Sequence, residues 1–238
     1  YKRQKCIYVS AHVDTLGAVV AEIKSNGRLR LSPVGGFNAN NAEAHNCRVY
    51  TYDGQIYEGT IQLADASLHV NKEYSTTQRT FQSVEVVLDE PVTSKDDVKA
   101  LGITNGCFVC ADPNLVVTNS GYIKSRFLDD KLSAAILLGY AKYIRENNIT
   151  PLRKVYQHMT VFEEVGHGAC ASIPEDVTEL LSVDMGCVGD GLECTERQVS
   201  ICAKDGHGPY NYQVTTGLVN AAKKDSIDSV SYTHLTLP

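Results

Sequence analysis

Three short apolar runs in this 238-residue chain each end in a side chain that can carry charge. The runs are mixtures of β-branched and aromatic residues, which is typical of buried β-strands. The runs and the residues that follow them are 6–11 with His12, 155–162 with Glu163 and Glu164, and 180–183 with Asp184. Between the first two runs, residues 130–147 space their apolar side chains as a helix does. This order predicts an open α/β sheet, whose ligands lie beyond the carboxyl ends of the strands.

The stretch from about residue 20 to residue 118 has a different pattern. Short strand-like runs with polar alternation follow one another there, and they are 18–23, 29–31, 47–52, 55–63 and 84–88. The pair Asp53-Gly54 is typical of a hairpin turn between two of these runs. One helix signal occurs, a start like a capping box with Ser94 and an acid at Asp97. The sequence therefore predicts that a β-rich domain interrupts the α/β domain.

Composition and charge argue against several classes of function. The chain has 22 Lys and Arg against 28 Asp and Glu, a formal net charge of −6, which argues against binding to nucleic acid or to an anionic membrane. No apolar run approaches the roughly 20 residues that a membrane-spanning helix needs. Eight cysteines are scattered through strand-like and helix-like segments, which favours free thiols in a cytoplasmic protein over disulfides.

Two short acidic motifs could contribute to a metal site. His12 is followed two residues later by Asp14, whose carboxylate could bond the second ring nitrogen and fix the imidazole tautomer. Asp129 and Asp130 precede the predicted helix, where a carboxylate could bridge two cations. The helix dipole alone also favours acids at that position.

Glu163, Glu164 and Asp184 follow buried strands, where desolvation makes an unpaired carboxylate costly. One imidazole and three or four carboxylates at one sheet edge suit two divalent cations such as Zn²⁺, Co²⁺ or Mn²⁺. Two such ions polarise a carbonyl group and activate water, and a remaining carboxylate can move the proton. The pattern therefore predicts hydrolysis.

Four segments, in this order and with similar spacings, resemble the consecutive motifs of the M42 family of dinuclear metallo-aminopeptidases. They are residues 10–17 (SAHVDTLG), 124–131 (KSRFLDDK), 161–166 (VFEEVG) and 182–184 (SVD). The resemblance extends from Cys6 to about Lys224. It implies an α/β/α sandwich of the metallopeptidase type with an inserted PDZ-like β domain, peptide substrates, and a cytoplasmic homo-oligomer that is a dodecamer in intact relatives.

The resemblance and the change of pattern together divide the chain into three parts. Residues 1–19 and 119–228 are expected to form the catalytic domain, which we expect to be truncated at both ends. Residues 20–118 are expected to form the β-rich assembly domain. Residues 212–224 have the apolar spacing of a helix. Residues 229–238, which follow, resemble translated adaptor sequence, and we expect them to be a non-native tail.

The resemblance also implies a role for each candidate residue. The metal ligands are His12, Asp129, Glu164 and Asp184, the general base is Glu163, and the residue that orients the imidazole is Asp14. His12 and Asp184 are expected to bind one ion and Glu164 the other, with Asp129 as the bridge. The Asp129–Asp130 peptide bond is expected to be cis. Members of the family supply one more imidazole from a late segment, which no histidine of this chain matches by motif.

Three functions therefore remain open on the sequence alone. The first is a metal-dependent aminopeptidase that removes N-terminal residues from peptides with water activated by two metal ions. The second is a catalytically silent fragment that binds metal or takes part in assembly. The third is a glycoside hydrolase of the endoglucanase kind, which needs a pair of carboxylates that are not occupied by metal.

Overall fold

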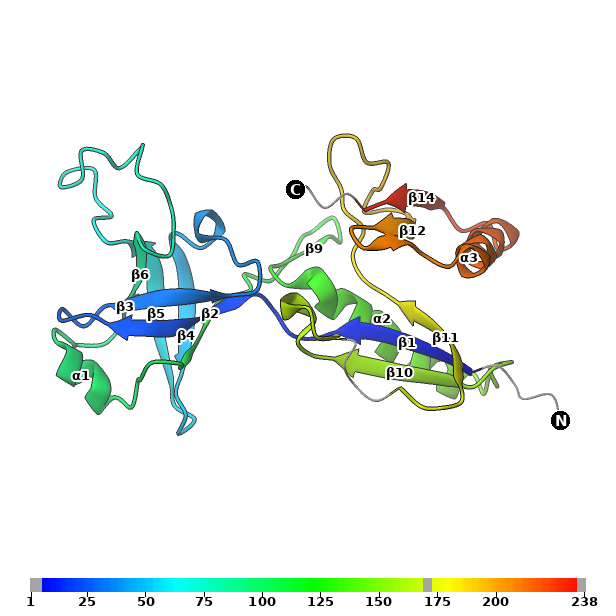
Figure 1. The fold of residues 1–238 in the computed structure, drawn as a ribbon, viewed down its shortest axis with the longest axis horizontal. Coiled ribbons are helices and arrows are strands. Elements are labelled where there is room, and N and C mark those ends of the chain that lie inside the picture. The colour runs from blue at the N-terminus through cyan, green and yellow to red at the C-terminus, as the bar shows by residue number, and fades with distance from the viewer. Residues whose placement is uncertain (1–5, 169–172, 235–238) are drawn as a thin grey trace. The chain divides into compact units, whose positions relative to one another are not determined.

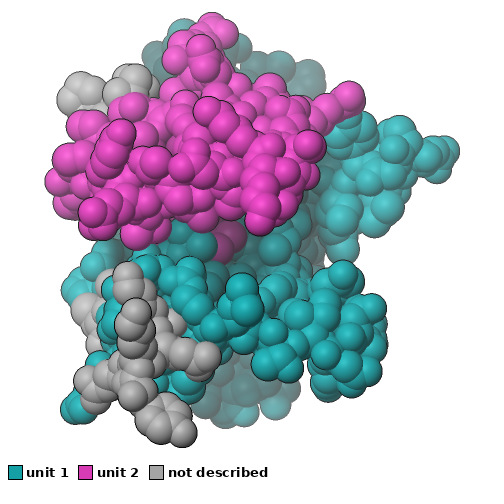
Figure 2. Space-filling model, turned by 90° about the vertical axis from the view of Figure 1, so that its right-hand side faces the viewer, with its two compact units in different colours: residues 1–181 teal, residues 182–238 magenta. Residues whose placement is uncertain are grey.

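The computed structural model describes residues 6–168 and 173–234. The fold is mixed α/β, as the sequence predicts. The chain divides into two compact units, residues 1–181 and 182–238, which Figure 2 colours separately. In the described part of the chain, no helix is both long enough and apolar enough to cross a membrane.

The first unit contains a three-stranded sheet of order β10–β1–β11. Its strands are β1 (Cys6–His12), β10 (Val155–Thr160) and β11 (Val177–Ser182). β1 and β10 run parallel, and their register places His12 opposite Thr160. Helix α2 (Leu128–Glu146) lies along β1 (Figure 1). The Gln157 side chain of β10 donates a hydrogen bond to the carbonyl of Leu137 in α2 at 2.7 Å. The helix therefore covers one face of this sheet.

Six strands between β1 and α2 form a closed barrel of order β2–β3–β6–β5–β4–β7. They are β2 (Gly17–Ile23), β3 (Leu29–Val34), β4 (His45–Tyr50), β5 (Ile56–Leu63), β6 (Val84–Leu88) and β7 (Phe108–Ala111). Alternate side chains fill the interior, where Leu29, Ile61 and Val86 are fully buried. Closure pairs every strand on both sides, so the barrel has no exposed edge. The PDZ-like character that the resemblance implies for this region stays a prediction.

Local sequence signals explain the short elements around the barrel. The predicted capping box is confirmed at α1 (Lys95–Ala100), where the Ser94 hydroxyl accepts from Asp97 N and the Asp97 carboxylate accepts from Ser94 N at 2.9 Å. The 3-10 helix η1 (Ala39–Asn41) follows β3. A hairpin of β8 (Val116–Val117) and β9 (Ile123–Lys124) leads from the barrel to α2.

The second unit contains a small sheet of order β13–β12–β14 and one helix. The strands are β12 (Val199–Asp205), β13 (Gly208–Pro209) and β14 (Ser229–Thr233), and the helix is α3 (Tyr212–Lys224). The bounds of α3 are those that the apolar spacing predicts, and the Asn211 side chain caps its first turn. β14 pairs in parallel with β12, so the structure gives a strand to the first five residues of the predicted tail, whose residues 235–238 lie outside the described part of the chain. The three-part division and the non-native origin of residues 229–238 stay predictions.

We predict that Leu29→Ala lowers the free energy of unfolding by about 2–5 kcal/mol, because it removes a fully buried side chain from the barrel core. Leu152→Ala is the matched control, because Leu152 is 94% exposed, and it should change the free energy by less than about 0.5 kcal/mol. Equilibrium urea unfolding followed by circular dichroism measures both values. Equal effects of the two substitutions would contradict the placement of Leu29 in a packed core.

Candidate metal centre

The sheet positions a buried histidine at its carboxyl edge. His12 is the last residue of β1, and it is only 2% exposed. Pairing with β10 continues one residue further, where Val13 N donates to the Thr160 carbonyl at 2.9 Å. The main chain on both sides of His12 is therefore hydrogen-bonded within the sheet, which holds the imidazole at the sheet edge.

A sharp turn brings two glutamates to the same edge. β10 ends at Thr160, and Phe162 adopts a left-handed conformation with φ of 66°. The sequence predicts that this strand continues to residue 162, with one glutamate on each side of it. Instead, Glu163 and Glu164 lie in the 3-10 helix η2 (Glu163–Val165), because a left-handed residue ends the extended conformation.

Carboxyl and carbonyl oxygens lie close to both nitrogens of the His12 ring. Nδ1 is 3.2 Å from the Asp14 carbonyl oxygen and 3.3 Å from Asp14 Oδ1. Nε2 is 3.0 Å from Asp129 Oδ1 and 3.6 Å from Glu163 Oε2. If Nδ1 donates its proton to Asp14, Nε2 presents a lone pair to the Asp129 carboxylate. Two electron-rich atoms at that distance need a positive charge between them, which a proton or a metal ion supplies.

The start of α2 supplies the Asp129 carboxylate. Asp129 and Asp130 both have non-helical main-chain torsions, and the peptide bond between them is cis, as the resemblance implies. Asp130 is 1% exposed, and its Oδ2 accepts a hydrogen bond from His12 N at 3.0 Å. Burial raises the pKa of the Asp130 carboxyl, whereas hydrogen bonds from Ser133 and from the His12 amide lower it.

The Glu164 carboxyl lies in a crowded acidic environment. Burial raises its pKa to about 7, and the charge of Asp129 raises it next, while His12 opposes the shift. Smaller repulsions come from Glu163 and Asp14. The Glu164 amide also donates to Asp14 Oδ2 at 3.2 Å, which ties η2 to the end of β1. A cation would relieve this repulsion.

These residues fit a divalent cation. One ligand atom each from His12, Asp129 and Glu164 lies within 4.8 Å of the other two. Among the residues that the structure describes, the buried Oδ1 atoms of Asp14 and Asp130 accept no hydrogen bond. His12 Nδ1 bonds the Asp14 main-chain carbonyl instead and lies 3.3 Å from Asp14 Oδ1. An imidazole with several carboxylates is a donor set that suits Zn²⁺, Co²⁺ or Mn²⁺. The predicted ligand Asp184 lies two residues after the end of β11 and belongs to the second unit. Its contribution to the centre stays a prediction.

The sequence analysis missed three contacts at this centre. Asp130 accepts from the His12 amide, and Lys131 Nζ donates to the Val13 carbonyl at 2.7 Å. Both contacts join residues 118 positions apart, so no local signal could reveal them. A Cβ on Gly35 would lie 2.7 Å from the Glu164 carbonyl oxygen, and Gly35 has φ of 65°. The pair Gly35-Gly36 was a readable signal of a close main-chain approach.

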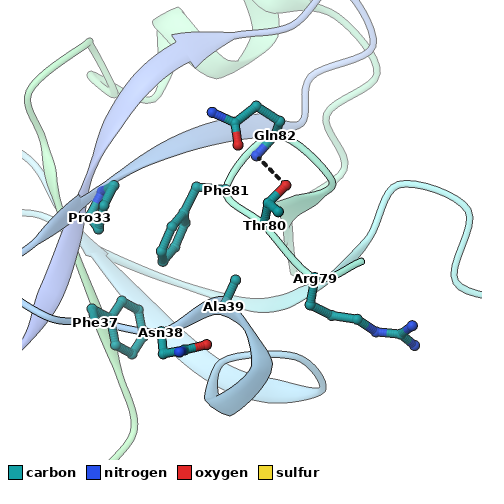
Figure 3. A pocket seen from close by; sticks show the side chains of 8 residues that line it. All are labelled: Pro33, Phe37, Asn38, Ala39, Arg79, Thr80, Phe81 and Gln82. Carbon is teal, nitrogen blue, oxygen red and sulfur yellow. Dashed lines mark hydrogen bonds between the residues drawn. The ribbon is translucent and has the colours of Figure 1, made fainter. Parts of the chain in front are cut away.

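A hollow of about 400 Å³ on the barrel is lined by none of the candidate residues of the metal centre. Figure 3 shows its lining residues, which are Pro33, Phe37, Asn38, Ala39, Arg79, Thr80, Phe81 and Gln82. Arg79 is the charged residue among them, and its guanidinium pairs with Glu43 and donates to the carbonyls of Tyr74 and Thr77. Among the described residues that line it, the hollow therefore has no carboxylate, imidazole or thiol.

Comparison with known proteins identifies a family for this chain. Residues 1–235 match the family described as M42 glutamyl aminopeptidase, and the chain belongs to that family. It is 44% identical over 220 residues to YhfE of Bacillus subtilis (strain 168), a match that covers 92% of this chain and 64% of YhfE. The chain thus spans less than two thirds of the length of that relative.

Solved structures share the fold. The TET aminopeptidase from the marine sediment archaeon Thaumarchaeota archaeon SCGC AB-539-E09 superposes with a TM-score of 0.83 at 19% identity, over 99% of this chain and 69% of that chain. The Pyrococcus horikoshii TET1 peptidase superposes with a TM-score of 0.82 at 22% identity, over 98% of this chain and 70% of that chain. At these identities the likeness shows the fold alone.

In the metal-free chain, we predict that Glu164→Gln gains stability relative to the unsubstituted chain as pH rises from about 4.5 to about 7. A carboxyl group with a raised folded-state pKa holds its proton in this window, whereas the unfolded chain loses it, so folding is disfavoured as pH rises. Glutamine does not ionise. Melting temperatures of both proteins in EDTA across this range measure the effect, and a difference that is independent of pH would contradict it.

Proposed function

We propose that this chain carries the catalytic centre of a metal-dependent aminopeptidase that removes N-terminal residues from peptides. The observation that carries the proposal is the convergence of His12, Asp129 and Glu164 at one sheet edge. Membership of the M42 glutamyl aminopeptidase family supports the reaction class. Because the chain spans 64% of the length of YhfE, the proposal concerns the activity of the whole protein.

Two divalent cations, Zn²⁺ or Co²⁺ with Mn²⁺ as an alternative, are the proposed cofactors. In this proposal, His12 and Asp184 would hold one ion and Glu164 the other, and Asp129 would serve both. When bound, such ions polarise the carbonyl group of the scissile bond and lower the pKa of water. Burial raises the pKa of Glu164, and the neighbouring acidic groups raise it further. This acidic crowding supports the assignment, because it favours a site for positive charge.

Glu163 is the proposed general base, and Asp14 the residue that orients His12. Glu163 is 49% exposed, and its carboxylate lies 3.6 Å from His12 Nε2, outside the cluster of three ligand atoms. It can therefore face both water and substrate, accept a proton from the attacking water, and pass that proton to the leaving amine. Asp14 holds Nδ1 so that Nε2 faces the proposed ligands.

Two assays separate the functions that the sequence leaves open, an aminoacyl-substrate panel for the first two and a cellulose assay for the third. A panel of aminoacyl substrates with and without Co²⁺ or Zn²⁺ separates an aminopeptidase from a silent metal-binding fragment. A glycoside hydrolase needs a pair of carboxylates free of metal, and the crowding of acids around one imidazole disfavours that.

We also propose that the intact protein is a homo-oligomer. The support is the shared fold with the Pyrococcus horikoshii TET1 peptidase, which can assemble into a tetrahedron or a large octahedral shell. Light scattering coupled to size-exclusion chromatography of the full-length protein tests this proposal. A monomer at micromolar concentration would contradict it.

In the full-length protein, Glu163→Gln should lower turnover by about a hundredfold to ten-thousandfold, because removal of a proton-transfer group costs that much. Bound metal should stay close to the unsubstituted level, because Glu163 is not a proposed ligand. Steady-state kinetics and elemental analysis measure the two quantities. Unchanged turnover would remove Glu163 from the mechanism.

Asp129→Ala should lose both metal and activity, because a bridging carboxylate serves both ions. Elemental analysis after gel filtration measures the metal content, and Glu146→Ala on the exposed end of α2 is the control. Two ions still bound per chain in the Asp129 variant would contradict the bridging role.

A further inference from the structure

We propose that Asp130 and Lys131 are positioning residues that hold the main chain on either side of the His12–Val13 peptide and so aim the His12 imidazole. The Asp130 carboxylate accepts from His12 N at 3.0 Å, and the Lys131 ammonium donates to the Val13 carbonyl at 2.7 Å. We call these two hydrogen bonds the α2 clamp. The inference rests on the proposed function for the identity of the metal, but the clamp itself consists of contacts within this chain.

The clamp acts where the sheet no longer determines the main chain alone. β1 ends at His12, and its pairing with β10 finishes with the hydrogen bond from Val13 N. The direction of the imidazole and the position of Asp14 beside it depend on the torsions of His12 and Val13. The α2 clamp holds the amide at the start of this dipeptide and the carbonyl at its end.

The same turn of α2 also carries a proposed ligand. Asp129 directly precedes the two clamp residues, and its Oδ1 lies 3.0 Å from His12 Nε2. The turn therefore presents a carboxylate to one side of the imidazole while it holds the main chain of that same histidine. One segment thus sets the distance between two proposed ligands that are 117 residues apart in sequence.

Charge alone gives the opposite expectation for Lys131. An ammonium group beside a cation site repels the ion, so its removal should tighten metal binding if electrostatics decided the outcome. If the hydrogen bond to Val13 decides, removal of the ammonium should weaken binding, because loss of a group that orients a ligand typically costs tenfold to a hundredfold in metal affinity. The two explanations predict changes of opposite sign.

A Co²⁺ titration followed by visible absorption distinguishes them. Lys131→Met keeps the apolar stem and removes the donor, and we expect its Kd to rise about tenfold with a changed Co²⁺ spectrum. Lys131→Arg keeps charge and donors and should restore the Kd and spectrum of the unsubstituted chain. Lys142→Met, on an exposed part of α2, makes the same charge change away from the centre and should change neither. A Kd for Lys131→Met equal to or below the unsubstituted value overturns the proposal.

Two neutral variants test the role of Asp130. Both remove the same negative charge, so a difference between them does not come from charge. Asp130→Asn keeps an oxygen acceptor for His12 N, whereas Asp130→Ala removes it. We expect Asp130→Ala to bind Co²⁺ about tenfold more weakly than Asp130→Asn. Equal affinities would remove Asp130 from the clamp. Because Asp130 is buried and its variants can fail to fold, the exposed Lys131 keeps the proposal testable.

Hydrogen exchange tests the clamp without metal. In EDTA, Lys131→Met should exchange the amides of residues 12–15 roughly tenfold faster than the unsubstituted chain, because a hydrogen bond to a charged group is lost. Lys142→Met should leave these rates unchanged. If the unsubstituted chain binds no Co²⁺, the proposed metal site is wrong, but the exchange rates still test whether Lys131 holds the main chain at Val13. Identical exchange in the Lys131 and Lys142 variants overturns it.

Discussion

The parallel register between β1 and β10 is the constraint on which the metal centre depends. It places His12 opposite Thr160, and the chain then reaches Glu163 only three residues later. A shift of one residue would turn His12 to the opposite face of the sheet. The turn at Phe162 keeps both glutamates at the edge where the imidazole lies. Thus main-chain hydrogen bonds of the sheet set the positions of groups that repel one another.

That repulsion has to be offset by stability from elsewhere in the fold. The centre combines a buried imidazole, the Glu164 carboxyl with a pKa of about 7, and two buried carboxylate oxygens without hydrogen-bond partners among the described residues. Each of these features lowers the stability of the metal-free chain. The barrel has the opposite character, since its core is apolar and its strands are paired all round. Functional sites commonly break local rules that the rest of a fold obeys.

Local signals predicted the elements well and their long-range arrangement poorly. The capping box at Ser94 and the bounds of α3 depend on neighbouring residues, so the sequence revealed both. Apolar spacing predicted five of the six barrel strands, all except β7, but not the closure of the barrel, because strand order depends on pairs distant in sequence. The candidate ligands could be named from strand ends, and the cis peptide at Asp129 from the resemblance. The Lys131 contact, and the identity of Glu164 as the residue that Gly35 approaches, became visible only once segments far apart in sequence were placed in space.

The closed barrel has a consequence for the entropy of the chain. Its first and last strands are neighbours, since Ala18 pairs with Val109, so the chain enters and leaves the barrel at adjacent points. Once the barrel has folded, only the connections before β2 and after β7 still have to be closed to bring His12 and Asp129 together. Because closure entropy grows with the logarithm of loop length, this saves on the order of 1 kcal/mol when the two ligands meet. An insertion within the barrel that preserves the pairing of β2 with β7 therefore leaves the effective distance between the ligands along the chain unchanged.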